Sequence, residues 1–119
     1  MKTWAVVGLG NNPERAAFGV AKLLQDKGHR IIPVYPRAEI VHGEIGYRTL
    51  HEIPDEVDVV DCFVNSTLVG KVVDEAIAIG AKAIWLQLDV IDEEAMVRAQ
   101  SAGLLTVMNR CPAIEYRSR

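Results

Sequence analysis

Cysteine is scarce in this chain, which argues against a disulfide-stapled or metal-bound protein. Only Cys62 and Cys111 occur among its 119 residues, and no Cys-x-x-Cys pair is present. Two thiols do not make a disulfide framework. The histidines, His29, His42 and His51, are scattered and lack the paired spacing of metal ligands. We therefore expect a reduced, cytoplasmic protein without a metal site.

Long apolar runs and an excess of positive charge are also missing. The apolar runs are far shorter than the roughly 20 residues that a membrane span requires. Residues 1–3 lead straight into a strand-like segment, so we expect no signal peptide. Lysine and arginine number 13 against 16 acidic residues, and no basic stripe alternates with aromatic residues. We expect neither a membrane nor nucleic acid as a partner.

What the chain does contain is a regular alternation of strand-like and helix-like segments. Glycine or proline punctuates most of the boundaries, and Asn12 with Pro13 suits the start of the first helix. This alternation predicts one α/β domain over residues 1–119, with a doubly wound, mostly parallel five-stranded sheet and helices on both faces. Pro33 indicates that the second strand is an edge strand or that the proline lies at a strand end. The expected strands are 4–9, 30–35, 57–64, 83–88 and 104–108, and the expected helices are 13–27, 66–79 and 92–102.

The segment between the second and third long strands is the least regular part of the chain. Turn signals occur at residues 42–43 and 45–46. We expect a very short strand at residues 47–49, followed by a single helical turn at residues 50–53. No periodic pattern predicts how this segment packs.

The opening strand ends in a glycine turn that suits a phosphate group. The turn reads Gly8, Leu9, Gly10, Asn11, Asn12. Its glycines permit a tight turn and close approach of the backbone to a ligand, and a helix N-terminus attracts anions. The third glycine of a dinucleotide fingerprint is absent. A plain strand–helix turn is therefore the alternative interpretation.

Arginines near the first two strand ends strengthen the phosphate interpretation. Arg15 falls in the first turn of the expected helix, where a cation opposes the helix dipole unless an anion lies nearby. After the second strand come Tyr35, Pro36 and Arg37, with no acid before Glu39. An NAD site usually has an acid here, whereas arginine suits a phosphorylated ribose, as in NADP or coenzyme A. The alternative for Arg37 is a solvated surface charge.

Two later strand ends carry polar or reactive groups. Asn65, Ser66 and Thr67 offer side-chain donors, although Ser66 or Thr67 also suits the cap of the next helix. Cys111 stands beside Arg110, and a neighbouring cation lowers the pKa of a thiol. An inert thiol is the alternative. No nucleophile and base can be paired from spacing, so a binding protein is favoured over an enzyme.

Taken together, several segments of the chain match a known family pattern. They are AVVGLGNNPERAAFGVAKLLQ at 5–25, IIPVYPR at 31–37, GYRTLHEIPDEVDVVDCF at 46–63, EAIAIGAKAIWLQLDV at 75–90 and VMNRCPAIEY at 107–116. By these segments the chain resembles the small stand-alone CoA-binding-domain proteins. That family is similar to the N-terminal domain of the succinyl-CoA synthetase alpha subunit.

The resemblance implies a Rossmann-like fold that binds coenzyme A. By it, residues 8–12 and Arg15 would hold the pyrophosphate, and residues 35–37 would border the adenosine 3′-phosphate. Asn65 and Ser66 would line the other side. Stand-alone members lack the domain that carries the synthetase's phosphorylated histidine, so no ligase activity is implied.

The leading hypothesis is thus a non-catalytic module for coenzyme A or an acyl-CoA. One alternative is a small enzyme, either NADP-linked or dependent on the Cys111 thiol. Another is an interaction protein whose nucleotide site has decayed. The sequence indicates a small nucleotide ligand and identifies no protein partner.

Overall fold

Strand and helix alternate along the whole described part of the chain. The structure is a computed structural model, and it describes residues 3–110. The elements are β1 (Thr3–Val7), α1 (Ala16–Asp26), β2 (Arg30–Val34), the short 3-10 helix η1 (Leu50–Glu52), β3 (Val59–Cys62), α2 (Ser66–Ala78), β4 (Ala83–Leu86), α3 (Glu93–Ser101) and β5 (Leu105–Val107).

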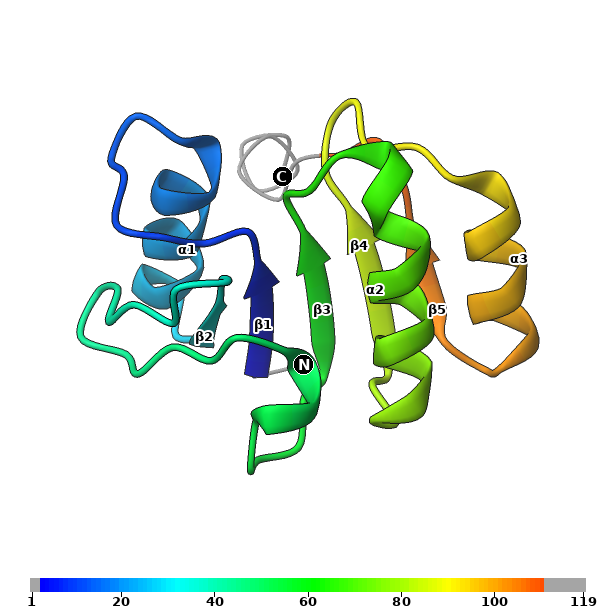
Figure 1. Ribbon diagram of the computed structural model, residues 1–119, viewed down its shortest axis with the longest axis horizontal. Coiled ribbons are helices and arrows are strands. Elements are labelled where there is room, and N and C mark those ends of the chain that lie inside the picture. Colours follow the sequence, from blue (N-terminus) through cyan, green and yellow to red (C-terminus); the bar gives the residue numbers. More distant parts are fainter. Residues whose placement is uncertain (1–2, 111–119) are drawn as a thin grey trace.

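The strands form one parallel sheet whose order reverses between β1 and β3. The order is β2-β1-β3-β4-β5, and every pair of neighbours is parallel (Figure 1). This confirms the predicted Rossmann-like α/β fold. It also places Pro33 on an edge strand, where β2 pairs only with β1 among the named strands. In such sheets ligands bind beyond the carboxyl ends of the strands at the reversal point.

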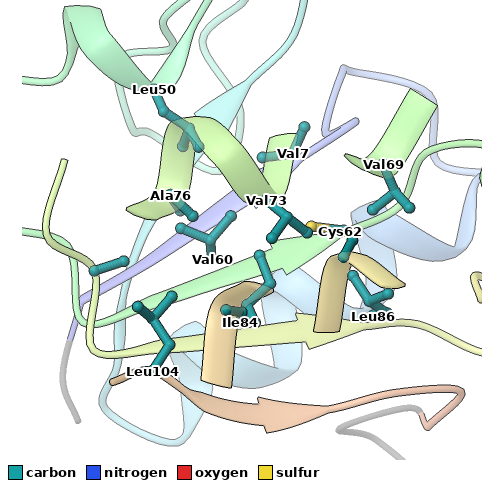
Figure 2. Packing of buried hydrophobic residues seen from close by; sticks show 14 of the residues in the cluster. Val7, Leu50, Val60, Cys62, Val69, Val73, Ala76, Ile84, Leu86 and Leu104 are labelled. Atoms are coloured by element: carbon teal, nitrogen blue, oxygen red, sulfur yellow. The ribbon is translucent and has the colours of Figure 1, made fainter. Parts of the chain in front are cut away.

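Helices cover both faces of the sheet because the side chains of each strand alternate between them. On β1, Ala5 and Val7 join the core beneath α2 and α3, whereas Trp4 and Val6 join the core beneath α1. The first core is shown in Figure 2, where apolar side chains of β3 and β4 lie against those of α2. The labelled residues are Val7, Leu50, Val60, Cys62, Val69, Val73, Ala76, Ile84, Leu86 and Leu104.

The first helix begins later than the sequence predicts. We expected it to start at Pro13 with Asn12 as the N-cap, but α1 starts at Ala16. The Asn12 side chain instead accepts a hydrogen bond from the Glu14 amide at 3.0 Å, which closes a local turn. Arg15 then adopts an extended backbone, with φ −82° and ψ 141°, and is the last residue before the helix.

Two smaller expectations are also corrected. The short strand at residues 47–49 is only an isolated bridge between Val34 and Tyr47, while the helical turn expected after it is η1. The cap of α2 is Asn65 rather than Ser66 or Thr67. Its side chain accepts hydrogen bonds from the amide and the hydroxyl of Thr67, both at 3.1 Å.

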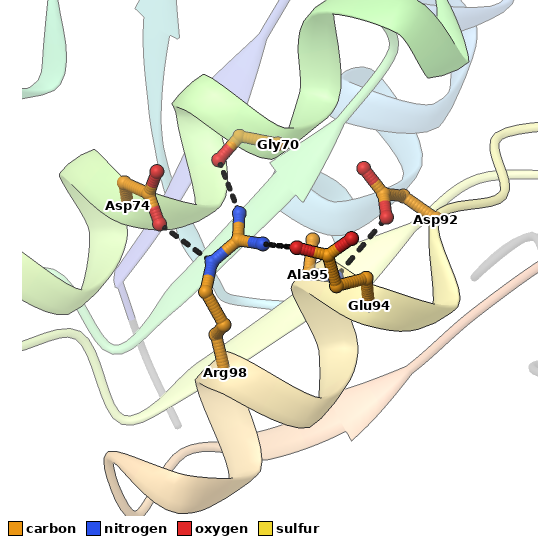
Figure 3. Close-up of polar contacts among 6 residues, drawn as sticks. All are labelled: Gly70, Asp74, Asp92, Glu94, Ala95 and Arg98. Carbon is orange, nitrogen blue, oxygen red and sulfur yellow. Dashed lines mark hydrogen bonds and ion pairs between the residues drawn. The ribbon is translucent and has the colours of Figure 1, made fainter.

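Arg98 ties α3 to α2 across the face of the sheet (Figure 3). Its guanidinium lies 3.1 Å from Asp74 Oδ1 on α2 and 3.1 Å from Glu94 Oε1 on its own helix, and it donates to the carbonyl of Gly70 at 3.4 Å. A Cβ at Gly70 would lie 3.2 Å from an oxygen of Asp92, so glycine lets the start of α3 come close. The two helices are therefore joined by polar contacts as well as by their shared core.

Asp61 is a carboxyl group buried within the sheet. It lies on β3 between Val6 of β1 and Trp85 of β4, and its exposed fraction is 0%. One oxygen accepts a hydrogen bond from the Gln87 amide, and the other has no hydrogen-bond partner in the structure described here. Burial raises the pKa of Asp61 to about 8, against the smaller lowering effect of the Gln87 bond. The group is therefore protonated in the folded protein at neutral pH.

The stability of the protein should depend on this proton. Between pH 3.8 and about 8 the folded state holds a proton that the unfolded state has released, so stability falls as pH rises through this window. In this window the group lowers the free energy of unfolding by at most about 1.4 kcal/mol for each pH unit. We expect Asp61→Asn, which stays neutral, to remove that slope. Urea unfolding at several pH values between about 5 and about 8 measures it.

The matched control for this prediction is Asp26→Asn on the surface. Asp26 pairs with Lys22 at 3.2 Å, and 60% of its side chain is exposed. This change should leave the pH slope of the wild-type protein in place. Parallel stability curves for the wild type and Asp61→Asn would contradict a protonated Asp61.

Candidate functional site

Gly8 brings three strand ends together at the reversal point. Its amide donates to the carbonyl of Val34 on β2 at 2.8 Å, while Phe63 after β3 donates its amide to the carbonyl of Val7 at 2.8 Å. Gly8 has φ +99°, and a Cβ there would lie 2.5 Å from the carbonyl oxygen of Phe63. Only glycine fits this backbone conformation and this spacing.

Two compartments of one cleft meet at this point. The polar compartment, about 270 Å³, lies over the glycine turn. Its lining residues are Gly8, Gly10, Asn11, Asn12, Arg15, Tyr35, Arg37 and Glu39. The apolar compartment is larger, about 430 Å³, and lies between η1 and α2. Because Gly8, Arg15 and Tyr35 line both, the two compartments adjoin.

Apolar side chains form most of the second compartment, with charged groups among them. The apolar lining is Val7, Val34, Pro36, Leu50, Phe63, Val64, Leu68 and Val72. Asn65, Arg48, Lys71 and Glu75 also line it. The compartment therefore suits an elongated, largely apolar group whose ends are polar or anionic.

All but two of the sequence-predicted site residues line one of these compartments. The exceptions are Leu9 and Ser66. Leu9 is fully buried in the core beneath α1. The Ser66 hydroxyl donates to the carbonyl of Asp89 at 3.2 Å and accepts from the amide of Ile91 at 3.0 Å, so it holds the loop after β4. The structure thus brings together the turn, the end of β2 and Asn65.

Two backbone amides of the glycine turn are already bonded within the protein. The Gly8 amide donates to Val34, as described above, and the Asn11 amide donates to Glu39 Oε1 at 2.8 Å. The turn amides without an acceptor within residues 3–110 are those of Leu9, Gly10 and Asn12. Leu9 is fully buried and lines neither compartment, so a bound phosphate group would have two of these donors at hand, the amides of Gly10 and Asn12, with Glu39 beside them.

The cleft carries more positive than negative side chains. Four cations, Arg15, Arg37, Arg48 and Lys71, line the two compartments with two carboxylates. The whole chain, by contrast, has a formal net charge of −3. Within the described residues, Arg15 and Arg37 form no salt bridge. The cleft is thus a local concentration of positive charge in an otherwise acidic protein.

Sequence reasoning missed Arg48, Lys71 and the contact made by Glu39. A signal for Lys71 was present, because residues 68, 71, 72 and 75 recur at helical spacing directly after a predicted strand end. Arg48 and Glu39 lie in the irregular segment before η1, where no periodicity places a side chain.

Neither thiol chemistry nor a metal site can be placed in the described cleft. Burial raises the pKa of the Cys62 thiol well above its usual range, and the Asp61 carboxyl adds to this effect. Cys111 lies outside the described residues. No cluster of potential metal ligands occurs within residues 3–110. In the same part of the chain, every helix is too short or too polar to cross a membrane.

Comparison with known proteins connects this geometry to a family. A model of the family described as "CoA binding domain" matches residues 2–117. A hypothetical protein from Pyrococcus horikoshii OT3 has a solved structure that is 40% identical, with a TM-score of 0.94 over 98% of this chain and 82% of that chain. The uncharacterized protein YneT of Bacillus subtilis (strain 168) is 34% identical over 115 residues, 97% of this chain and 85% of that protein.

A larger protein also contains a related segment. The alpha subunit of acetate–CoA ligase [ADP-forming] II from Pyrococcus furiosus is 33% identical over 81 residues, which are 67% of this chain but only 18% of that protein. The resemblance inferred from the sequence is confirmed: the chain belongs to the CoA-binding domain family, which is related to ADP-forming acetate–CoA ligase subunits.

Proposed function

We propose that the protein binds coenzyme A or an acyl-CoA in the two-compartment cleft and carries out no ligase chemistry of its own. One observation carries the proposal: an acidic chain gathers four cations along one cleft, with two free backbone amides at the glycine turn where its compartments meet. Such a site is suited to a ligand with several phosphate charges. Family membership supports the same ligand class.

The shape of the cleft suggests how the ligand lies. The pyrophosphate sits at the junction, within reach of Arg15 and the free amides of Gly10 and Asn12. The adenosine 3′-phosphate lies in the polar compartment toward Arg37. The pantetheine arm, which is long and weakly polar, extends into the apolar compartment past Leu68. The ligand's charge and its apolar arm thus meet complementary surfaces.

The proposal includes no covalent step. Within residues 3–110 no cysteine, serine or histidine lines either compartment. The residues at the cleft can hold, orient and neutralise a ligand. The hydroxyl of Thr49, which lines the apolar compartment, meets a carboxylate, Glu52 Oε1, only at 3.4 Å. The ligase relative, of which this chain matches only a small fraction, therefore contributes a ligand class and not a reaction.

The Arg37 side chain should distinguish ligands that carry a 3′-phosphate from those that do not. We expect the protein to bind coenzyme A about tenfold more tightly than dephospho-CoA, since one charge-assisted contact with Arg37 distinguishes them. Arg37→Ala should abolish this preference. Isothermal titration calorimetry with both ligands measures it, and NADPH serves as a third ligand because arginine also suits its ribose phosphate.

Arg30→Ala is the matched control for Arg37→Ala. Arg30 begins β2, at the opposite end of the same strand, and pairs with Asp55 at 2.8 Å. This variant should keep the wild-type preference. Equal affinities of the wild type for both CoA forms would remove the role of Arg37. Binding of NADPH without binding of coenzyme A would replace the proposal with the NADP hypothesis.

The role of the apolar compartment can be tested at Leu68. Leu68 lines it from α2, and its side chain is 62% exposed, so a larger residue fits without disturbing the core. We expect Leu68→Trp to weaken coenzyme A binding by about tenfold, because the indole occupies the space of the pantetheine arm. Adenosine 3′,5′-bisphosphate lacks that arm and should bind Leu68→Trp as it binds the wild type.

Leu88→Trp provides the control for added bulk. Leu88 is also an exposed leucine, 48% exposed, but it lines neither compartment. Leu88→Trp should leave the affinities for coenzyme A and for adenosine 3′,5′-bisphosphate unchanged in calorimetric titrations. If Leu68→Trp lost affinity equally for coenzyme A and for adenosine 3′,5′-bisphosphate, the pantetheine arm would not lie in the apolar compartment.

A further inference from the structure

The glycine turn holds a carboxylate at one of its backbone amides. Glu39 Oε1 accepts the Asn11 amide at 2.8 Å. A Cβ at Gly10 would lie 2.8 Å from the same oxygen, so the absence of a side chain at Gly10 leaves room for it. The carboxylate thus lies close against the backbone of the turn and uses one of its donors.

The backbone conformation on either side of Glu39 places its side chain over the glycine turn. Ala38 has φ +48°, a conformation rare for residues other than glycine, and its amide bonds the carbonyl of Tyr35 at 2.9 Å. Gly46 lies directly against the backbone of Glu39, where a Cβ could not fit. The loop therefore reverses direction at Ala38 and returns Glu39 over the turn.

The rest of the loop is fastened to α1 and to the turn. The Asn11 side-chain amide bonds the carbonyl of Ile40. His42 Nε2 donates to the carbonyl of Phe18 at 2.8 Å, and Gln25 donates to the carbonyl of His42 at 3.0 Å. Because the backbone is held in this way, the Glu39 side chain can leave the turn by rotation while the loop stays in place.

Glu39 bonds the amide although two cations line the same compartment. Within the described residues it forms no salt bridge with Arg15 or Arg37. Those guanidinium groups therefore remain available to a ligand while the carboxylate holds the Asn11 amide. A phosphate oxygen and the carboxylate cannot both take this N–H group at close range, because their like charges repel.

We infer that Glu39 is an internal anion of the phosphate site, which a ligand must displace in order to bind. This inference rests on the proposed function, and it identifies Glu39 as the residue that sets the affinity of the site for the ligand. A ligand with a pyrophosphate group offsets the lost Glu39 contact through Arg15 and the free amides, whereas a less charged ligand does not. Glu39 therefore sets how much anionic charge a ligand must bring, and it lowers the affinity for every ligand that occupies the turn.

The test compares Glu39→Ala and Glu39→Gln with a control on the same loop. Glu44→Ala removes a half-buried acid that lines neither compartment. Calorimetry with coenzyme A should give about tenfold tighter binding for Glu39→Ala than for the wild type, and a change of about twofold or less for Glu44→Ala. Glu39→Gln keeps an acceptor for the Asn11 amide but loses the charge. Its affinity for coenzyme A should therefore lie between that of the wild type and that of Glu39→Ala.

Weaker binding by Glu39→Ala would overturn the inference, because Glu39 would then contact the ligand directly, for example at ribose hydroxyl groups. If Glu39→Ala and Glu44→Ala changed the affinity for coenzyme A equally, the inference would also be overturned, since the effect would then come from the net charge of the protein alone. Inorganic pyrophosphate is the second probe, and it should follow the same order of variants as coenzyme A.

A measurement without ligand separates this inference from the proposed function. In amide NMR spectra of the free protein, loss of a carboxylate acceptor should move the Asn11 proton upfield in Glu39→Ala and leave it in place in Glu44→Ala. If the shift occurs but no variant binds coenzyme A, the proposed function fails and the internal anion stands. If the Asn11 proton does not move, the inference fails whatever coenzyme A does.

Discussion

The site depends on the close approach of three strand ends at Gly8. The Gly8 amide holds the carbonyl of Val34, and its α-carbon lies against the carbonyl of Phe63. These contacts fix the exits of β2, β1 and β3 side by side at the point where the strand order reverses. Segments distant in sequence, such as the loop after β2 and the start of α2, then face each other across the cleft. A side chain at this position would separate them.

The electrostatic character of the cleft comes from loops and helix ends, whereas the sheet supplies only position. Arg15 precedes α1, Arg37 follows β2, and Lys71 stands in the second turn of α2. Glu39 enters the same space from the loop that also carries Arg37, so attraction for an anion is partly satisfied inside the protein. If the proposed ligand binds here, its affinity would depend on the difference between two interactions of the turn, one with the internal Glu39 carboxylate and one with the external anion.

The sequence predicted the sheet and much of the cleft because both follow from regular patterns. Alternating apolar segments indicated five parallel strands, and Pro33 indicated an edge strand or a strand end, of which the structure shows the edge strand. The start of α1 was misplaced because the Asn12 side chain bonds the Glu14 amide and closes a turn, which local propensity does not distinguish from a helix cap. The position of Glu39 could not be predicted at all. It depends on the positive φ of Ala38 and on tertiary contacts of an irregular loop.

The buried carboxyl group of Asp61 has a consequence for how the protein behaves in bulk. With a pKa of about 8, it leaves the folded chain at neutral pH with one negative charge fewer than the formal −3. The native protein should therefore migrate in an electric field as a less acidic molecule than its composition suggests. Unfolding at neutral pH also discharges a proton into the solvent, so the heat absorbed will depend on the ionisation enthalpy of the buffer chosen.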